Sequence, residues 1–148
     1  MTASKVAKMT DKNRILIVDD DDVVRRSYLR SLESTSCQVA AACDGEEALQ
    51  TMEQNPFDVV LLDMRMPGQD GLSVLRTIKQ KWPDSEVVII TGYPTVDSAK
   101  QAVQLGAYDY IAKPVGPQDV VNITDRAMTR KQWALRRLPE ETNAANAA

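Results

Sequence analysis

The sequence predicts a single α/β domain built as a three-layer sandwich, with helices covering both faces of a parallel sheet. Two observations lead to this prediction. Short apolar runs that fit buried strands alternate with segments whose apolar residues recur every three or four positions, as in helices that bury one face. Five such strand–helix units follow one another in the 148 residues, and right-handed crossovers between consecutive units make the strands parallel.

Three runs of four apolar residues give the clearest strand signals. An unbroken apolar run fits a strand that is covered on both faces, because a strand with one wet face alternates apolar and polar residues. These runs are Ile15–Val18, Val59–Leu62 and Val87–Ile90. A shorter strand near Tyr108–Ala112 and a weak one at Gln38–Ala42 complete the expected sheet.

A helix is expected after each strand. Asp21 or Asp22 can cap the first helix by accepting hydrogen bonds from its first-turn amides, and Gly106 is a natural stop for the fourth. The fourth helix, near Thr95–Leu105, has the poorest apolar stripe. The side chains expected to face inward are, in chain order, Val24, Tyr28, Leu32, Ala48, Leu49, Met52, Leu72, Leu75, Ile78, Val96, Ala99, Val103, Val120, Ile123 and Ala127.

The folded domain is expected to span residues 13–130, with both ends of the chain outside it. Residues 1–12 are polar without periodicity, so we expect them to be mobile. The fifth helix should start after Pro117 and end at Leu138, because Pro139 disfavours a helical residue before it. Residues 131–148 would then form the extended helix end and a disordered tail or linker.

Composition excludes several classes of function. A net charge of −3 disfavours a general nucleic-acid surface, and the sequence has neither a membrane span nor a signal peptide, so we expect a cytoplasmic protein. Histidine is absent, so any phosphohistidine chemistry must come from another protein. Cys37 and Cys43 lack the spacing of a zinc or redox motif and are interpreted as two reduced thiols.

Polar residues stand directly after four of the expected strands. The first strand ends in the four aspartates Asp19–Asp22, and three later strands end in Asp63, Thr91 and Lys113. Because the carboxyl ends of parallel strands share one edge of the sheet, these groups should converge there. The first and third strands should flank the switch point, which places Asp19 and Asp20 beside Asp63. Asp21 and Asp22 fit better as helix caps and surface charges.

The converging carboxylates predict a metal site. Three adjacent carboxylates do not all stay ionised unless a cation compensates them. Oxygen-only ligands favour a hard ion, so we expect Mg²⁺, with Mn²⁺ as a substitute. The carboxylate ligands would be Asp19, Asp20 and Asp63. The backbone carbonyl of Arg65, two residues after Asp63, is placed to complete the set.

The remaining two groups turn this site into a clamp for a phosphoryl group. The ammonium of Lys113 neutralises phosphoryl oxygens and the hydroxyl of Thr91 donates to one of them. Asp63 is then the candidate nucleophile, forming an aspartyl phosphate. One aspartate after a strand is usually a helix cap and one Lys-Pro is usually a loop. Suitable residues at all four strand ends favour the phosphoryl site over that structural interpretation.

With these motifs in place, the chain resembles a response regulator receiver domain of two-component signalling, over about residues 14–128. The matching pieces together are highly specific. They are Ile-Leu-Ile-Val-Asp19-Asp20-Asp, Leu-Leu-Asp63-Met-Arg-Met-Pro67-Gly-Gln-Asp-Gly71, Val-Ile-Ile-Thr91-Gly-Tyr and Gly106-Ala-Tyr-Asp-Tyr110-Ile-Ala-Lys113-Pro114.

The resemblance implies a flavodoxin-like fold with strand order 2-1-3-4-5, and it implies a role for each matching residue. Asp63 would be phosphorylated by a sensor histidine kinase or a histidine phosphotransfer protein, and the Lys113–Pro114 bond would be cis. The chain would not be a conventional enzyme. The other implied roles are the Mg²⁺ site for Asp19, Asp20 and the Arg65 carbonyl, phosphoryl contacts for Thr91 and Lys113, and an activation-dependent rotamer for Tyr110.

The expected output surface runs from the helix near Thr95–Leu105 through the last strand to the fifth helix. The thin apolar stripe of that helix suits a bistable element, and the surface would bind a partner or a second copy of the chain. Trp133, Leu135 and Leu138 add apolar area if the extension is not simply a solvated linker.

Two other functions remain open from the sequence. A Mg²⁺-dependent phosphohydrolase with an aspartate nucleophile needs a second aspartate where Arg65 stands. A degenerate receiver used only for docking would not need the intact Asp63, Thr91 and Lys113. Arg65 and Tyr93 are bulky neighbours of the site and could shield it or steer water, so the lifetime of a phosphorylated state does not follow from the sequence.

Overall fold

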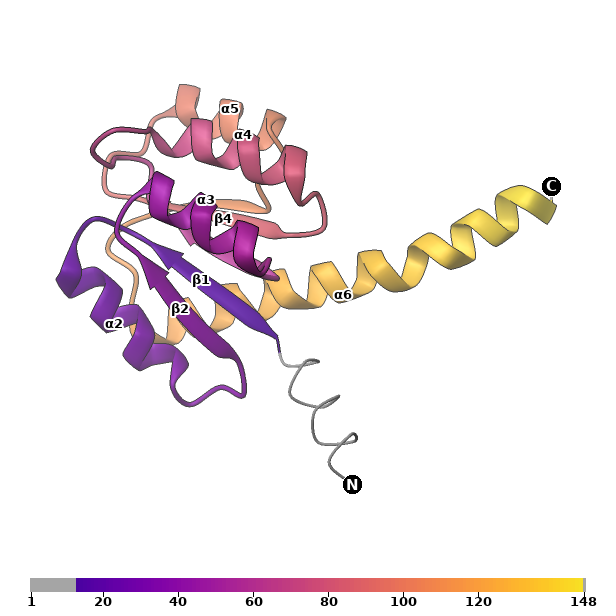
Figure 1. The fold of residues 1–148 in the computed structure, drawn as a ribbon, viewed down its shortest axis with the longest axis horizontal. Helices are drawn as coiled ribbons and strands as arrows, with labels where there is room; N and C mark the ends of the chain where they lie inside the picture. The colour runs from indigo at the N-terminus through magenta and orange to yellow at the C-terminus, as the bar shows by residue number, and fades with distance from the viewer. Residues whose placement is uncertain (1–12, 148) are drawn as a thin grey trace.

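The computed structural model describes the backbone of residues 13–147 and the side chains of residues 13–133. The predicted mobility of residues 1–12 concerns a segment outside the described residues. Strands and helices alternate through the described chain as the sequence predicts (Figure 1). The strands are β1 Arg14–Val18, β2 Gln38–Ala42, β3 Val59–Leu62, β4 Glu86–Thr91 and β5 Asp109–Ala112, and the helices are α2 Asp22–Leu32, α3 Gly45–Gln54, α4 Gly71–Lys81, α5 Val96–Gln104 and α6 Pro117–Ala147.

The five strands form one parallel sheet in the order β2-β1-β3-β4-β5, which confirms the predicted topology. Helices α3, α4 and α5 cover one face, and α2 and α6 cover the other (Figure 1). The order reverses between β1 and β3, whose register pairs Val18 with Leu62. The residues that follow these two strands therefore start side by side at the carboxyl edge of the sheet.

The central strands are buried on both faces, which explains their unbroken apolar runs. In β3, Val60 and Leu62 face the α3–α4 side while Val59 and Leu61 face the α2–α6 side. All four residues of the strand are at most 1% exposed. Alternate side chains of a strand point to opposite faces, so a strand inside three layers needs an apolar residue at every position.

Four of the five helices bury the faces that their periodicity predicts. Tyr28 and Leu32 of α2 are buried, and Asp21 caps that helix through the amide of Val23. The expected inward residues of α3, α4 and α6 are buried or packed against the core. They are Ala48, Leu49, Met52, Leu72, Leu75, Ile78, Val120, Ile123 and Ala127.

The prediction for α5 was wrong in its orientation. Val96 and Val103 are 74% and 67% exposed, whereas Ala102 is fully buried. Ala102 and Leu105, three residues apart, pack against the core instead. A small residue against the sheet lets the helix lie close to it, so the contact with Ala102 outweighs burial of two valines. Helix α5 is consequently held by little apolar area.

Helix α6 differs from the prediction at its end. It continues past Leu138 and Pro139 to Ala147, where we expected a stop and a disordered tail. Proline removes one hydrogen bond of the helix ladder, but the helix beyond it includes Ala144, Ala145 and Ala147, and alanine is the strongest helix former. The extension projects well beyond the sheet (Figure 1). The division of the chain at residue 130 is still a prediction.

Where α6 leaves the sheet, two ion pairs tie it to the amino ends of neighbouring strands. Lys131 pairs with Asp58, just before β3, and Arg130 Nε lies 3.9 Å from Glu86 Oε2 in β4. The backbone N–H of Arg14 donates to the same Asp58 carboxylate at 2.7 Å.

No helix in the described part of the chain has the length and apolar character to cross a membrane.

Candidate functional site

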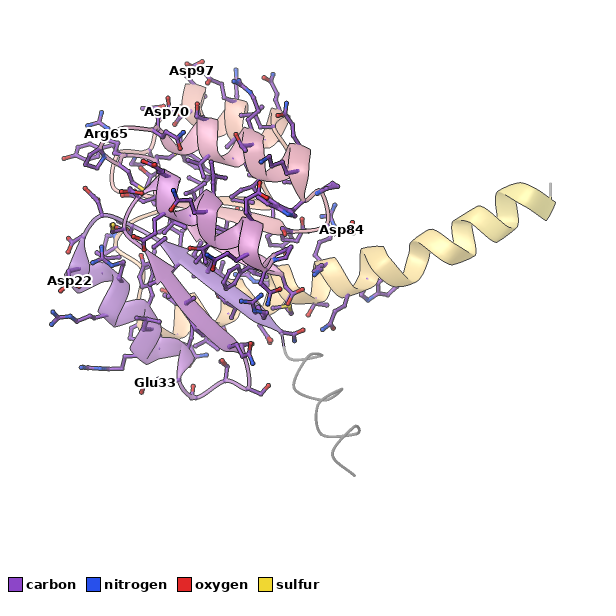
Figure 2. The ribbon with its side chains drawn as sticks, viewed as in Figure 1. Asp22, Glu33, Arg65, Asp70, Asp84 and Asp97 are labelled. Atoms are coloured by element: carbon purple, nitrogen blue, oxygen red, sulfur yellow. The ribbon has the colours of Figure 1, made fainter. Side chains whose placement is uncertain are left out.

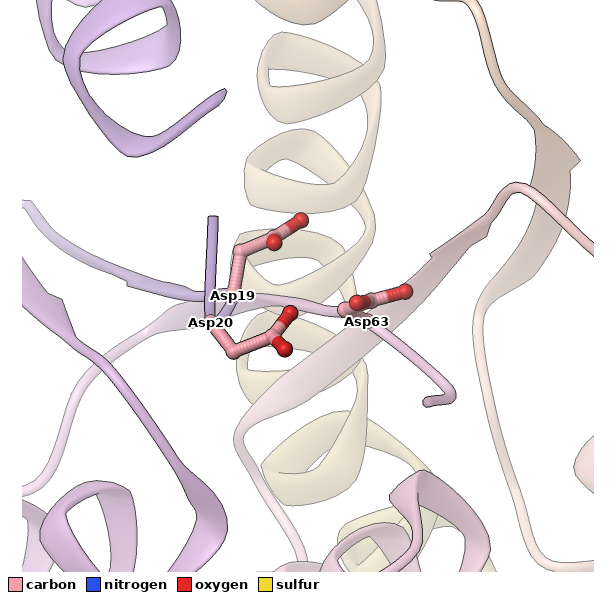
Figure 3. A group of neighbouring side chains, drawn as sticks. All are labelled: Asp19, Asp20 and Asp63. Atoms are coloured by element: carbon pink, nitrogen blue, oxygen red, sulfur yellow. The ribbon is translucent and has the colours of Figure 1, made fainter. Parts of the chain in front are cut away.

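The three carboxylates predicted to converge do so at the carboxyl edge of the sheet (Figure 3). Asp19 and Asp20 follow β1, and Asp63 follows the adjacent β3. One carboxylate oxygen from each residue lies within 4.8 Å of the others. Asp19 and Asp63 are only 2% and 7% exposed, whereas Asp20 is exposed. The group therefore has a buried floor and an open side toward solvent.

Asp19 is held in place through its backbone and both carboxylate oxygens. Its Oδ1 accepts the backbone N–H of Asp21 at 2.9 Å, and its Oδ2 accepts Lys113 Nζ at 2.8 Å. Arg25 of α2 donates to its backbone carbonyl at 2.8 Å. Arg25 was not singled out from the sequence, since an arginine in the first turns of a helix usually carries only surface charge.

Lys113 reaches the acidic group from the end of β5, as predicted. Its Nζ lies 3.7 Å from Asp63 Oδ1, in addition to its hydrogen bond with Asp19. Burial alone lowers the pKa of Lys113, but the bond to Asp19 and the charges of Asp19 and Asp63 outweigh burial and raise it. The ammonium thus stays charged between the two buried carboxylates. The Lys113–Pro114 bond is cis, which confirms that prediction.

The Asp63 carboxyl resists ionisation in this setting. Burial raises its pKa to about 6 from the ordinary 3.8, and the charge of Asp19 adds to the rise. Lys113 and the backbone N–H of Arg65 oppose that rise without cancelling it. One ammonium therefore does not compensate the charges of the group. A hard divalent cation on these oxygen ligands would lower the pKa again, so the residues present fit Mg²⁺ or Mn²⁺.

Thr91 and Tyr110 lie on the neighbouring strands, in different surroundings. Thr91 ends β4 and is fully buried, and its hydroxyl accepts the backbone N–H of Tyr93 at 3.1 Å. The Tyr110 hydroxyl lies 2.5 Å from the Ser98 hydroxyl and accepts the Thr95 backbone N–H at 3.2 Å. Tyr110 therefore supports the first turn of α5. Thr95 and Ser98 were not predicted as site residues, although Thr95 stands at a position typical of a helix cap.

Comparison with known proteins decides what this arrangement is. The family model described as "Response regulator receiver domain" matches residues 15–125. The chain belongs to the response regulator receiver domain family. The match includes the acidic group, Thr91 and Lys113, so the receiver domain carries its family's sequence pattern through all the strand ends described above.

The receiver domain is similar to the amino-acid sequences of longer regulators. It is 39% identical over 116 residues to "DNA-binding transcriptional regulator NtrC" of Klebsiella pneumoniae, covering 78% of this chain and 25% of the relative. It is 35% identical over 138 residues to "Alginate biosynthesis transcriptional regulatory protein AlgB" of Pseudomonas syringae, covering 93% of this chain and 30% of that relative. The chain thus spans about a quarter to a third of the length of these relatives.

Solved structures support the same fold. A CheY-like receiver domain protein from Methanospirillum hungatei superposes with a TM-score of 0.81 at 28% identity, covering 84% of this chain and 99% of the other. NtrX from Brucella abortus superposes with a TM-score of 0.78 at 29% identity, covering 88% of this chain and 29% of NtrX. The predicted flavodoxin-like class is therefore confirmed.

Gly71, the first residue of α4, allows the start of this helix to lie against the backbone of Asp63 and Met64. A Cβ on Gly71 would lie 2.7 Å from the Asp63 carbonyl oxygen and 2.7 Å from Met64 Cα. The Gly71 N–H also donates to the Met64 carbonyl at 2.8 Å. Both close atoms belong to the backbone, so they cannot move as a flexible side chain would. The position of the Asp63 backbone thus depends on glycine here.

Replacing Gly71 by alanine is expected to destabilise the domain by about 1–3 kcal/mol, the usual cost of overpacking. The added methyl group has to displace the backbone of Asp63 or Met64. Urea unfolding measures the change, with Gly92→Ala as the matched control. The Cβ of that control meets nothing closer than the Lys113 side chain at 3.9 Å. Equal stability of the two variants would contradict the close approach.

Proposed function

We propose that this chain is the phosphoacceptor of a two-component phosphorelay. Asp63 takes a phosphoryl group from the phosphohistidine of a sensor histidine kinase or a histidine phosphotransfer protein. The observation that carries this proposal is the position of Asp63, which lies beside the carboxylates of Asp19 and Asp20 and 3.7 Å from the ammonium of Lys113. The membership of the chain in the receiver domain family supports the same assignment.

In the proposed transfer, a carboxylate oxygen of Asp63 attacks the phosphorus as the bond from phosphorus to the partner's histidine nitrogen breaks. Magnesium held by Asp19, Asp20, Asp63 and the Arg65 carbonyl would supply positive charge to the phosphoryl oxygens. Lys113 adds a second positive charge from the end of β5, and the Thr91 hydroxyl donates to a phosphoryl oxygen. The ionised form of Asp63 is the nucleophile, so a cation that lowers its pKa also activates it.

The proposal covers the chain's partners in outline. The relatives are regulators of transcription by their names, and their other parts lie outside the region matched here. We propose that residues 1–148 do not themselves bind nucleic acid, in line with their net charge of −3. A cytoplasmic location is part of the same proposal. So is the absence of a conventional enzyme activity, since the chain would catalyse only its own phosphorylation and dephosphorylation.

One experiment separates this function from the two others. The protein is incubated with acetyl phosphate and Mg²⁺, and both intact mass and released phosphate are followed. A phosphoacceptor gains one acid-labile, hydroxylamine-sensitive phosphoryl group that persists. A phosphohydrolase releases phosphate in many turnovers without accumulating the adduct. A docking-only receiver does neither, and that result would reject the proposal.

Metal binding is expected to depend on Asp20 and not on its near neighbour Asp22. Asp20 belongs to the acidic group, whereas Asp22 pairs with Arg25 at 3.1 Å and with Arg26 at 2.5 Å. Asp20→Ala should weaken Mg²⁺ binding at least about ten-fold, since losing a residue that only supports a ligand already has that effect. Asp22→Ala should leave affinity nearly unchanged. Titration calorimetry with Mg²⁺ measures both, and equal losses would contradict the assignment.

We further propose that phosphorylation acts through α5. If the Thr91 hydroxyl turns toward a phosphoryl group on Asp63, it gives up the Tyr93 amide at 3.1 Å. Tyr110 can then move into the space that this leaves, which breaks its contacts with Thr95 and Ser98. Helix α5 has one fully buried residue, Ala102, so these two contacts are a large part of its anchoring.

The surface formed by α5, β5 and α6 is therefore the proposed site for a partner or a second copy of the chain. Val96 and Val103 already expose apolar area there in the described structure. A surface of this kind switches when a bistable element changes its packing.

Amide hydrogen exchange with and without beryllofluoride tests the proposed output path. We expect exchange to change over residues 95–105, because the phosphate mimic should alter the contacts of Tyr110 with the first turn of α5. Residues of α2 and α3 serve as internal controls. Changes centred on those two helices, with residues 95–105 unaffected, would reject the path.

A further inference from the structure

A pocket of about 300 Å³ lies at the amino edge of the sheet, between the α2–β2 loop and α6. Cys37, the last residue of the loop, and Thr124 and Asp125 of α6 are among the residues that line it. Glu33, where the loop begins, lies far from Arg65 of the β3–α4 loop (Figure 2). The pocket is therefore separate from the acceptor site, which lies at the carboxyl edge.

The hydroxyl of Thr124 is buried in the wall of this pocket and lacks a partner. The residue is 3% exposed, and its Oγ1 forms no hydrogen bond within the part of the chain that the structure describes. Hydroxyls in helices commonly donate to the carbonyl four residues earlier, as those of Ser31, Thr51, Thr77 and Thr129 do here. The Thr124 hydroxyl makes no such bond, and a buried polar group without a partner is costly. A ligand in the pocket would supply the missing partner.

The same pocket contains one thiol and one charge. Cys37 is a free cysteine and is half-buried. Asp125 is the only charged residue among the described residues that line the pocket. It is exposed, and its carboxylate forms no ion pair within residues 13–133. A small molecule that carries both a positive charge and a sulfur able to react with a thiol fits this combination.

Cys43, the other cysteine of the chain, is more exposed but is held by carboxylates. Its Sγ lies 3.3 Å from Glu47 Oε2 and 3.8 Å from Asp44 Oδ2. The hydrogen bond to Glu47 raises the pKa of the Cys43 thiol, and the negative charges of Glu47 and Asp44 add to the rise. Because the thiolate is the reactive form of cysteine, the greater exposure of Cys43 does not make it the more reactive thiol.

We propose that Cys37 is a modification site, where a small disulfide that carries ammonium groups leaves one half bound as a mixed disulfide. This inference goes beyond the proposed function and does not depend on it. The thiolate of Cys37 attacks one sulfur of the small disulfide, so that a bond forms between that sulfur and Cys37 Sγ while the reagent's own S–S bond breaks. The other half leaves as a thiolate and takes up a proton, and the proton of the Cys37 thiol goes to solvent.

The half that stays bound has a use for both unpartnered groups of α6. An ammonium group has three N–H donors and no acceptor. It can therefore pair with the carboxylate of Asp125 and also donate to Thr124 Oγ1, the neighbouring residue in the wall of the pocket. A neutral or anionic disulfide lacks the charge that Asp125 would attract.

The charge preference is tested in Cys43→Ser, where Cys37 is the only cysteine. The variant is equilibrated with cystamine or with the neutral bis(2-hydroxyethyl) disulfide, each at a fixed ratio of reduced to oxidised reagent, and intact mass measures the adduct. Adding Asp125→Asn should lower the ratio of the two equilibrium constants about two- to five-fold, as for an exposed ion pair. Comparing this ratio between variants cancels the intrinsic reactivities of the reagents. Asp84→Asn, at an exposed position between α4 and β4, is the matched control and should leave the ratio unchanged.

Thr124→Val in the same background removes the hydroxyl and keeps the shape of the side chain. Its equilibrium constant for the cystamine adduct should fall about two- to ten-fold, the effect of one hydrogen bond. The unmodified variant should resist urea at least as well as unmodified Cys43→Ser, since a buried hydroxyl without a partner is lost. A merely structural role for Thr124 would lower that stability and leave the adduct constant unchanged.

The chain with both cysteines gives the last comparison. After brief exposure to cystamine, peptide mapping should find the first adduct on Cys37, although Cys43 is the more exposed thiol. First labelling of Cys43, an unchanged ratio in Asp125→Asn, or an unchanged adduct constant in Thr124→Val would each overturn the proposal.

Discussion

Asparagine in place of Asp63 is expected to abolish phosphate uptake while leaving the fold intact. The amide has nearly the shape of the carboxylate, so it fits the same buried position at the end of β3. It lacks the negative oxygen that attacks phosphorus, and an amide is a far weaker nucleophile than a carboxylate. No other carboxylate of the acidic group combines burial with an unbonded oxygen near Lys113, because both oxygens of Asp19 are occupied and Asp20 is exposed.

The measurement is intact mass after incubation with acetyl phosphate and Mg²⁺, followed by peptide mapping. The parent chain should gain one phosphoryl group on Asp63, and Asp63→Asn should gain none. Asp70→Asn is the matched control, since it makes the same chemical change in the same loop. Asp70 caps α4 by accepting the Ser73 N–H at 2.8 Å, and asparagine caps equally well. Labelling of Asp63→Asn at the parental level would show that the acceptor is a different residue.

Much of this site could be predicted because it depends on strand ends. A buried strand in three layers has to be apolar at each position, so Val59–Leu62 marks its own end at Asp63. Parallel neighbours then bring Asp19 and Asp63 together through the β1–β3 register, without any information about side-chain packing. Lys113 follows by the same reasoning at the end of β5.

Contacts that depend on how a helix is rotated about its own axis, or on how a loop lies, could not be predicted in this way. The stripe Val96, Ala99 and Val103 of α5 has nearly the same periodicity as the face that includes Ala102, and only packing decides between them. The cation–π contact between Arg65 and the ring of Tyr93 joins two irregular loops, for which the sequence has no periodicity to read. The hydrogen bonds of Tyr110 with Thr95 and Ser98 arise from where the first turn of α5 lies over β5.

Because the pKa of Asp63 is raised, the ionised Asp63 carboxylate should lower the free energy of unfolding of the metal-free protein above about pH 6. The folded-state pKa is about 6 and the ordinary value is 3.8, so the folded protein binds more protons than the unfolded chain between these values. The contribution of Asp63 to the free energy of unfolding therefore falls as pH rises from about 4 through about 6, and it stays low above that. A difference of about two pKa units corresponds to about 3 kcal/mol.

Comparing the parent with Asp63→Asn isolates this contribution, because the other carboxylates titrate in both proteins. In EDTA, the variant should be the more stable protein at pH 7.5, by up to about 3 kcal/mol in urea unfolding. Its advantage should shrink as pH falls through 6 and nearly vanish near pH 4, where Asp63 is protonated in both states. Saturating Mg²⁺ should stabilise the parent more than the variant at pH 7.5, since the cation compensates the buried charge. An advantage that is independent of pH would mean that the Asp63 carboxyl ionises as it does in water, and that burial and Asp19 do not act on it.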